Sequence, residues 1–481
     1  VTKLPDTQLP GPISIEVIRQ VAASFKQATS CVDNWHPRHF SGLSDEGTRG
    51  MAHMFRIFEA SATWPENEQE LLTNLIPKTD GGLRPIALYR TAYRVYAKCK
   101  CKEVREWAKN TAGYQCNTAK GRWVGDATWR SQITTAIDGT DTYAVETLFD
   151  LMKAFENVKR AQLLEIGAKV GYPLPQLIMS LRSYQWTRRI LYDGMVSKPI
   201  TPRRGIGAGS AFATFELWCM LKPAIERMQQ FHPTVVICLH VDDLCMTARS
   251  KDRDTVVDLM HSVVQMATEE FEVKRSLPFA AGKTYVVGSH MDLAKEIASS
   301  IDGATAAESV KKLGIDYSLG CTKNKRNSLM KVHKGRMLKA VQRAIKLKKR
   351  LKGGAPRVYT TGVLPMALYG AEHASIPHLD ICTLQKQAAA CGSVKPTGVN
   401  ARFKLLAVAT DANPAFKARS APLLRWAREV WLTTSKVVTK EQDLLNGLQL
   451  HKAAVIIQQG DDNDTVAQGP IKAIIQSLKY Y

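Results

Sequence analysis

The sequence lacks several features that would point at once to a class of protein. It holds ten cysteines but no CxxC pair, and its closest spacing, Cys99-Lys100-Cys101, has no histidines at zinc-site intervals. No run of eighteen apolar residues occurs, which argues against a membrane-spanning helix. Neither an internal repeat nor a low-complexity block is present. We therefore expect reduced, structural cysteines, an intracellular compartment and no membrane partner.

Acidic residues are scarce relative to basic ones. The chain has 66 Lys and Arg against 44 Asp and Glu, a formal net charge of +22 and a pI of about 9.5. Such an excess favours a polyanionic partner, most simply nucleic acid, although a solvated basic surface would give the same numbers. With 481 residues and 45% hydrophobic content, the chain can form two to four domains with a sizeable core.

Two adjacent carboxylates interrupt an apolar, β-branched run. Asp242 and Asp243 follow the stretch Val235-Val-Ile-Cys-Leu-His-Val241. Burying a carboxylate without a partner costs several kcal/mol, and removing the partner of a buried ion pair costs about 3–5 kcal/mol. The expected compensation for these two aspartates is therefore a divalent cation, which takes oxygen ligands. Taken alone, an Asp-Asp pair is more often part of a turn.

A third carboxylate strengthens the metal interpretation. Residues 144–149 form a second apolar strand pattern, which closes on Asp150. Two such strand ends side by side in one sheet would bring Asp150, Asp242 and Asp243 together, where they would repel each other and partly protonate without a cation. With two Mg²⁺ ions they would form a site for in-line phosphoryl transfer.

A cationic hairpin precedes these strands. Residues 72–78 and 83–88 read as its two arms, and Asp80-Gly81-Gly82 as its turn. A three-residue loop would place Lys78 directly across from Arg84 on one face, and a two-residue loop would place them on opposite faces. The pair would suit a triphosphate; alternatively it is a solvated hairpin tip.

The remaining pattern mixes helices and strands. Helices are expected over 11–60, 91–112 and 153–170, followed by another helix that ends at about Ser183. Further helices are expected from the glycine-rich entry at Gly205–Gly209 to about Met228 and over 252–270, and a strand is expected near 285–287. This order predicts an α+β domain with an antiparallel sheet. Residues 331–352 contain ten Lys or Arg and no acidic residue, which suits a helix laid on a phosphate backbone, a solvated helix or a nuclear-import signal at Lys348-Lys349-Arg350.

Several of these segments together resemble motifs of retroelement reverse transcriptases, and the non-LTR (LINE-like) retrotransposon enzymes most of all. The resemblance covers roughly residues 60–320. The matching segments are Leu75-Ile-Pro-Lys-Thr-Asp-Gly-Gly-Leu-Arg-Pro-Ile86, Phe149-Asp-Leu-Met-Lys-Ala-Phe-Glu-Asn-Val158, His240-Val-Asp-Asp243, Gly282-Lys-Thr284 and Lys312-Leu-Gly-Ile315.

The resemblance implies a right-hand polymerase with fingers, a palm with an antiparallel sheet, a thumb and a helical C-terminal region. The implied divisions are an N-terminal extension (1–60), fingers (61–143), palm with inserted fingers helices (144–320), a basic thumb-like region (321–400) and a C-terminal region of unknown role (401–481). The implied partners are an RNA template, a DNA primer or target and dNTPs.

The resemblance also assigns roles by position. Asp150, Asp242 and Asp243 would be the catalytic, metal-binding carboxylates, with the Leu151 carbonyl as a further ligand of two Mg²⁺ ions or of Mn²⁺. Phe155 would be the steric gate against a ribose 2′-hydroxyl, or else a core aromatic. Lys283 would lie near the triphosphate as a proton donor to pyrophosphate, or else be an ordinary exposed lysine. Lys78, Arg84 and Gly209 would complete the nucleotide-binding set.

Some positions depart from the family pattern. Gly207 and Ala208 stand where Pro and Gln are usual, Glu156 where Asp is usual, and His240 where Tyr or Phe is usual. Two alternatives to an RNA-directed DNA polymerase remain. The changed Gly207-Ala208-Gly209 segment favours a decayed or domesticated nucleic-acid-binding relative, and an RNA-dependent RNA polymerase would share the same palm, although Phe155 argues against it. We expect a nuclear location. Because the sequence begins at Val1 with no signal peptide, we also expect a fragment or partial gene product, and no endonuclease signature precedes residue 60.

Overall fold

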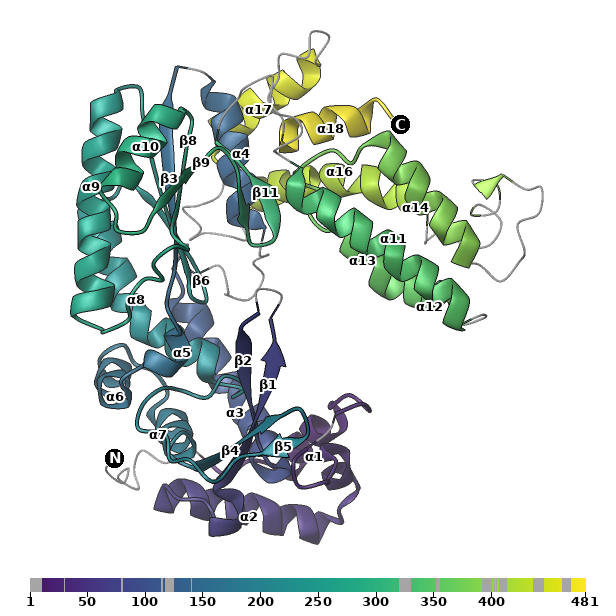
Figure 1. Ribbon diagram of the computed structural model, residues 1–481. Helices are drawn as coiled ribbons and strands as arrows, with labels where there is room; N and C mark the ends of the chain where they lie inside the picture. The colour runs from purple at the N-terminus through teal and green to yellow at the C-terminus, as the bar shows by residue number, and fades with distance from the viewer. Residues whose placement is uncertain are drawn as a thin grey trace.

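The computed structural model describes most of the chain, namely residues 11–29, 31–78, 81–113, 116, 125–139, 141–319, 330–351, 355–391, 400–401, 403, 405, 413–435, 445–460 and 469–481. Its five-stranded sheet stands at the upper left of Figure 1. The elements that precede this sheet in the chain are α1 (Ile15–Ala23), α2 (Asp45–Ser61), β1 (Glu70–Pro77), β2 (Leu83–Leu88), α3 (Thr91–Thr111) and α4 (Asp126–Asp138).

The central sheet has the strand order β6-β7-β3-β8-β9. Its strands are β3 (Tyr143–Asp150), β6 (Val236–His240), β7 (Asp243–Ser250), β8 (Tyr285–Gly288) and β9 (Thr305–Ala307). All neighbours are antiparallel except β8 and β9, which are parallel. The predicted α+β class with an antiparallel sheet is thus confirmed, with one parallel edge strand added.

Both faces of this sheet are covered. On one side lie α8 (Ala213–Phe231), α9 (Arg253–Thr268) and α10 (Met291–Ser299), at the left in Figure 1. On the other lie the hairpin of β10 (Val310–Lys312) and β11 (Ile315–Tyr317), and helix α4. Side chains alternate along β3: Val145 and Phe149 join the main core, whereas Ala144 packs under the β10–β11 hairpin.

The helix expected over 153–170 is two helices, α5 (Ala154–Asn157) and α6 (Arg160–Lys169). The backbone N–H groups of Gly205 and Ile206 donate to the carbonyls of Val158 and Phe155 at 2.9 and 2.8 Å. Those carbonyls therefore accept hydrogen bonds from the glycine-rich segment and not from the next turn of a continuing helix. Helix α7 (Leu174–Ser183) follows as expected.

A second, four-stranded sheet has the order β2-β1-β4-β5. It adds β4 (Thr187–Tyr192) and β5 (Met195–Val196) to the β1–β2 hairpin. Strand β4 pairs parallel to β1, and the sequence pattern did not predict it. The hairpin itself confirms the two arms expected from the sequence.

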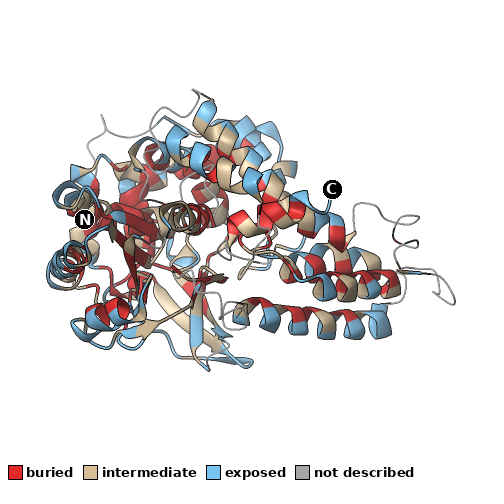
Figure 2. Ribbon diagram, turned by 90° about the horizontal axis from the view of Figure 1, so that it is seen from above, coloured by how far each residue is buried: buried red, intermediate tan, exposed pale blue. Residues whose placement is uncertain are grey.

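The C-terminal third is helical, as expected. It comprises α11 (Lys331–Leu351), α12 (Ala355–Val358), α13 (Leu364–Ala367), α14 (His378–Cys391), α16 (Pro414–Thr434), α17 (Gly447–Gln459) and α18 (Pro470–Leu478). Helix α11 buries Met337, Ala340 and Ala344 and leaves most of its Lys and Arg exposed. Figure 2 shows this one-sided burial in the helices at the right, in contrast to the largely buried sheet.

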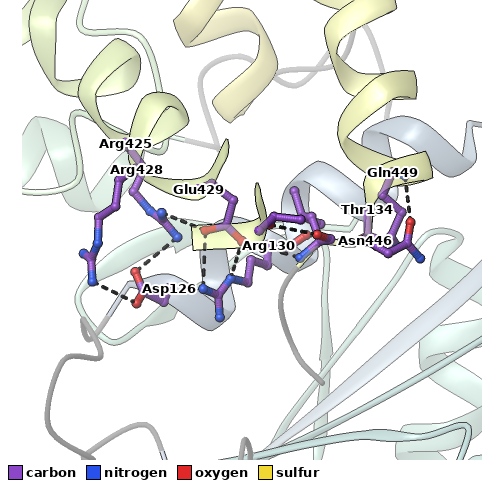
Figure 3. A network of polar contacts seen from close by, with 10 residues as sticks. Asp126, Arg130, Thr134, Arg425, Arg428, Glu429, Asn446 and Gln449 are labelled. Atoms are coloured by element: carbon purple, nitrogen blue, oxygen red, sulfur yellow. Dashed lines mark hydrogen bonds and ion pairs between the residues drawn. The ribbon is translucent and has the colours of Figure 1, made fainter. Parts of the chain in front are cut away.

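Helix α4 joins the C-terminal helices to the rest of the molecule. Trp129 and Ile133 of α4 share a core with α17 and α18. Beside that core, Arg130 of α4 donates to Glu429 of α16 at 2.7 Å, and Arg425 pairs with both Glu429 (2.9 Å) and Asp126 (3.1 Å) (Figure 3). Helix α4 thus contacts segments that lie some 300 residues later in the chain.

In the described part of the chain, no helix has the length and apolar character to cross a membrane. Most of the cysteines there are buried, as expected for structural side chains.

Candidate functional site

The three predicted aspartates lie at one end of the central sheet. Asp150 is the last residue of β3 and lies directly opposite Asp243, the first residue of β7. Asp242 lies in the turn that joins β6 to β7. Asp242 thus lies in a turn, as the alternative interpretation of the Asp-Asp pair expects, whereas Asp243 begins a strand.

The turn that carries Asp242 is tight and strained. His240 pairs with Asp243, so only Val241 and Asp242 form the loop. Val241 has a φ of 61°, a left-handed conformation that a β-branched residue rarely adopts and that costs about 1–3 kcal/mol. The N–H of Leu151 donates to the Asp242 carbonyl at 3.3 Å and ties this turn to the end of β3.

Two of the three carboxylates, Asp242 and Asp243, have a raised pKa. Burial, and then the nearby charge of Asp150, raises the pKa of Asp242, while Arg84 opposes the rise. Burial raises the pKa of Asp243 to about 6; Asp242 and Asp150 add to this, and Lys283 and Lys312 oppose it. Burial lowers the pKa of His240, so the neighbouring imidazole is neutral and supplies no compensating charge. The site as it stands has surplus negative charge near neutral pH.

One lysine partly offsets this charge. The Nζ of Lys283 lies 2.9 Å from Oδ2 of Asp150, and the lysine side chain is about half exposed. Among the described residues, no three His, Cys, Asp or Glu side chains already converge as metal ligands. The donor set is nevertheless that of a hard divalent cation: carboxylate oxygens at a shared sheet end, with like-charge repulsion that a cation would relieve.

The β1–β2 hairpin has neither of the two registers considered from the sequence. Arg84 lies opposite Ile76, and the N–H of Lys78 donates to the Gly82 carbonyl at 2.7 Å. Lys78 therefore does not lie directly across from Arg84, as the three-residue loop would have placed it, nor on the opposite face, as the two-residue loop would have. Because Lys78 faces Gly82, two residues from Arg84, the two cations are diagonal neighbours on one face.

Phe155 and Gly209 lie beside the carboxylates for different reasons. Phe155, in α5, packs against the main core while also lining the cavity described below, so both of its expected roles are compatible with its position. Gly209 has a φ of 116°, and a Cβ there would collide with the Ala87 carbonyl of β2. The preceding Ala208 carbonyl accepts from the Ala87 N–H at 2.6 Å. Glycine is needed because the two backbones touch.

The departure at Gly207 has a local explanation. A Cβ on Gly207 would lie 2.5 Å from the Tyr89 hydroxyl, which fills the space that a proline ring would take. The small residue and the tyrosine fit each other, so this departure does not distort the segment.

All nine predicted site residues line one cavity of about 1560 Å³. They are Lys78, Arg84, Asp150, Leu151, Phe155, Gly209, Asp242, Asp243 and Lys283. The cavity also has a wall that sequence reasoning did not include, formed by Lys311, Lys312, Leu313 and Gly314. The Lys312-Leu-Gly-Ile315 segment was noted only for its resemblance, and its position beside the carboxylates comes from the structure.

Residues 76–317, just over half of the chain, match the family described as reverse transcriptase (RNA-dependent DNA polymerase). The chain belongs to this family, and the predicted right-hand polymerase fold is confirmed.

No curated protein matches the chain in sequence. Three solved structures show a loose likeness, each at 10% identity. Apo telomerase from Candida tropicalis without its C-terminal domain has a TM-score of 0.37 over 62% of this chain and 63% of that one. Telomerase from Candida albicans with a fragment of telomeric RNA has a TM-score of 0.39 over 87% of this chain and 68% of that one. Apo telomerase from Candida tropicalis has a TM-score of 0.40 over 85% of this chain and 74% of that one.

Proposed function

We propose that the chain is the RNA-directed DNA polymerase of a non-LTR (LINE-like) retroelement. The observation that carries this proposal is the pairing of Asp150 with Asp243, with Asp242 in the adjoining turn, at the wall of a cavity that Lys78 and Arg84 also line. The substrates are an RNA template, a DNA primer or target and dNTPs. The division into fingers, palm, thumb and C-terminal region at the boundaries given above belongs to the same proposal.

Asp150, Asp242, Asp243 and the Leu151 carbonyl would hold the divalent ions, Mg²⁺ or in its place Mn²⁺. The chemistry supplied there is activation of the primer 3′-hydroxyl and neutralisation of charge on the transferred phosphate. Because the pKa of Asp243 is about 6, metal binding competes with its proton in mildly acidic solution.

The other cavity residues would act on the nucleotide. Arg84 offers a planar fork and Lys78 a point charge to the triphosphate. Phe155 would crowd a 2′-hydroxyl, and the Gly209 backbone would allow close approach of the nucleotide. Lys283, within hydrogen-bonding distance of Asp150, would donate a proton to the leaving pyrophosphate.

The basic helix α11 supports a nucleic-acid partner. Its apolar stripe faces the neighbouring helices, and its exposed side presents Lys and Arg, Lys348-Lys349-Arg350 among them. A long row of cations on one helix face suits a phosphate backbone and makes binding dependent on salt. The same exposed triplet is the basis for proposing a nuclear location.

Primer extension tests the function directly. Purified protein with Mg²⁺, a DNA primer and dNTPs is expected to extend on an RNA template, and EDTA is expected to abolish extension. A DNA template of the same sequence serves as the comparison. RNA binding without nucleotide incorporation would instead identify a binding relative that has lost catalysis.

Replacing Phe155 by Ala is expected to admit ribonucleotides. The ratio of rNTP to dNTP incorporation should rise by about 10- to 200-fold, the range expected when a steric contact in a pocket is removed. Phe215→Ala is the matched control, because Phe215 packs against the same core but does not line the cavity. A wild-type protein that already prefers rNTPs would identify an RNA polymerase.

A further inference from the structure

Arg160, the first residue of α6, binds the backbone of the chain that leads into the glycine-rich segment. Its Nε donates to the Gly205 carbonyl at 2.8 Å, and its Nη1 donates to the Pro202 carbonyl at 3.1 Å. Its Nη2 donates to the carbonyls of Tyr184 and Arg204 at 2.7 and 3.1 Å. All four bonds end on backbone oxygens of other segments, so the guanidinium joins α6 to the end of α7 and to residues 202–205.

The segment that Arg160 holds is in turn bonded to α5, which carries Phe155. The residue after Gly205 is Ile206, whose N–H donates to the Phe155 carbonyl at 2.8 Å. Gly205 itself has a φ of 86°, and a Cβ there would lie 2.7 Å from the Glu156 carbonyl oxygen. The two backbones are therefore in contact, and the position of Phe155 depends on where this segment lies.

Helix α5 needs such external support. It has four residues, fewer than an isolated helix requires, and it begins after Lys153, whose φ of 48° is left-handed. Arg160 suits the supporting role because a charged donor forms hydrogen bonds about twice as strong as a neutral one, and because its planar fork fixes their directions. Burial, and then the charge of Arg188, lowers the pKa of Arg160 to about 10, so the guanidinium stays charged at neutral pH.

We propose that Arg160 is a positioning residue that determines sugar specificity, because it fixes Phe155 at the place where the ring excludes a ribose 2′-hydroxyl. The inference rests on the proposed polymerase function and adds to the steric gate a residue that does not line the cavity. A steric contact is short-ranged, and a displacement of about 1 Å is enough to change a reaction rate by about 10²-fold. Without the guanidinium, residues 202–206 and α5 can shift together, and the ring no longer blocks the hydroxyl.

The chain offers a matched control in a second arginine. Arg188 of β4 is half-buried like Arg160 and donates to the same Tyr184 carbonyl, at 3.3 Å. Among the described residues its side chain makes no hydrogen bond to residues 202–206, and neither arginine lines the cavity. The test compares Arg188→Met with Arg160→Met, which keeps an apolar stem and removes the four bonds. Arg160→Lys retains the charge without the fork and is the graded variant.

The first readout is the ratio of kcat/KM for rNTP to kcat/KM for dNTP in primer extension. Loss of folded protein lowers both values equally and leaves their ratio unchanged, so a purely structural role would not move it. We expect the ratio to rise by about 10-fold in Arg160→Met, the lower end of the range for a lost steric contact, because the ring is displaced and not removed. Arg160→Lys should give a smaller rise, and Arg188→Met should match wild type.

A double variant shows whether Arg160 acts through Phe155. On the Phe155→Ala background there is no ring to position, so adding Arg160→Met should leave the ratio where Phe155→Ala sets it. The second readout needs no nucleotide: it is hydrogen exchange of the Gly205 and Ile206 amides, which lose protection when the segment separates from α5. We expect faster exchange in Arg160→Met and wild-type exchange in Arg188→Met.

The positioning role is wrong if the enzyme is active but Arg160→Met leaves the ratio or the amide exchange unchanged, or if Arg188→Met raises the ratio as far. A further rise when Arg160→Met is added to Phe155→Ala would also contradict it, because the arginine would then act on another part of the site. If wild type incorporates neither kind of nucleotide, the polymerase function fails and the specificity role falls with it. Faster exchange in Arg160→Met alone would then show only that the arginine holds the segment on α5.

Discussion

Asp150→Asn is expected to lower the rate of nucleotide addition by about 10³-fold, because several kcal/mol of charge stabilisation at the reacting phosphate are lost with a metal ligand. The substitution keeps the shape of the side chain and removes its charge. Single-turnover primer extension at saturating dNTP measures the effect.

The same variant should not destabilise the metal-free protein. Asp150 raises the pKa of both Asp242 and Asp243, so removing its charge relieves repulsion, and the Tm without divalent ions should stay the same or rise. The increase in Tm that Mg²⁺ produces in wild type should shrink. Asp252→Asn is the control, since Asp252 is an exposed helix cap at the start of α9. Wild-type extension by Asp150→Asn would contradict the assignment of the site.

Glu429→Gln is expected to destabilise the protein by about 3–5 kcal/mol, the usual cost of breaking a buried ion pair from one side. Glu429 is fully buried and bridges Arg130 of α4 and Arg425 of α16 (Figure 3). Its neutralisation leaves two guanidinium groups in the interior without the carboxylate between them. Urea denaturation measures the free energy of unfolding.

The control for this prediction is an exposed pair. Glu165 and Lys169 lie one turn apart on α6 with both side chains well exposed, so Glu165→Gln should leave the unfolding curve unchanged. Limited proteolysis of Glu429→Gln should cleave first in the C-terminal helices, because Arg130–Glu429 joins them to α4. A Glu429→Gln protein as stable as wild type would mean that the buried pair does not hold this junction.

Sequence reasoning worked where the signal is local. Asp242 and Asp243 stand out because charge in an apolar run needs compensation, and β3 and β6 follow from the same runs. It left the hairpin register open between two loop lengths, because the pattern of Asp80-Gly81-Gly82 does not choose between them. The ladder from Leu72–Leu88 to Pro77–Leu83 sets the register, and it gives neither of the two pairings considered. It missed β4 because Arg188 and Arg189 interrupt its apolar pattern, and the parallel pairing with β1 comes from a distant segment.

The kinds of side chain at the site, their order along the chain and the helix or strand character of their segments can thus be read from the amino acids, since these depend on neighbours a few residues away. Which strands lie side by side cannot be read in this way. The pairing of Asp150 with Asp243, the burial of Lys312 against a glutamate 166 residues earlier, and the docking of α16 on α4 each join remote segments. Such contacts form only when the whole core packs, because the free energy that selects them is summed over many residues far apart in the chain.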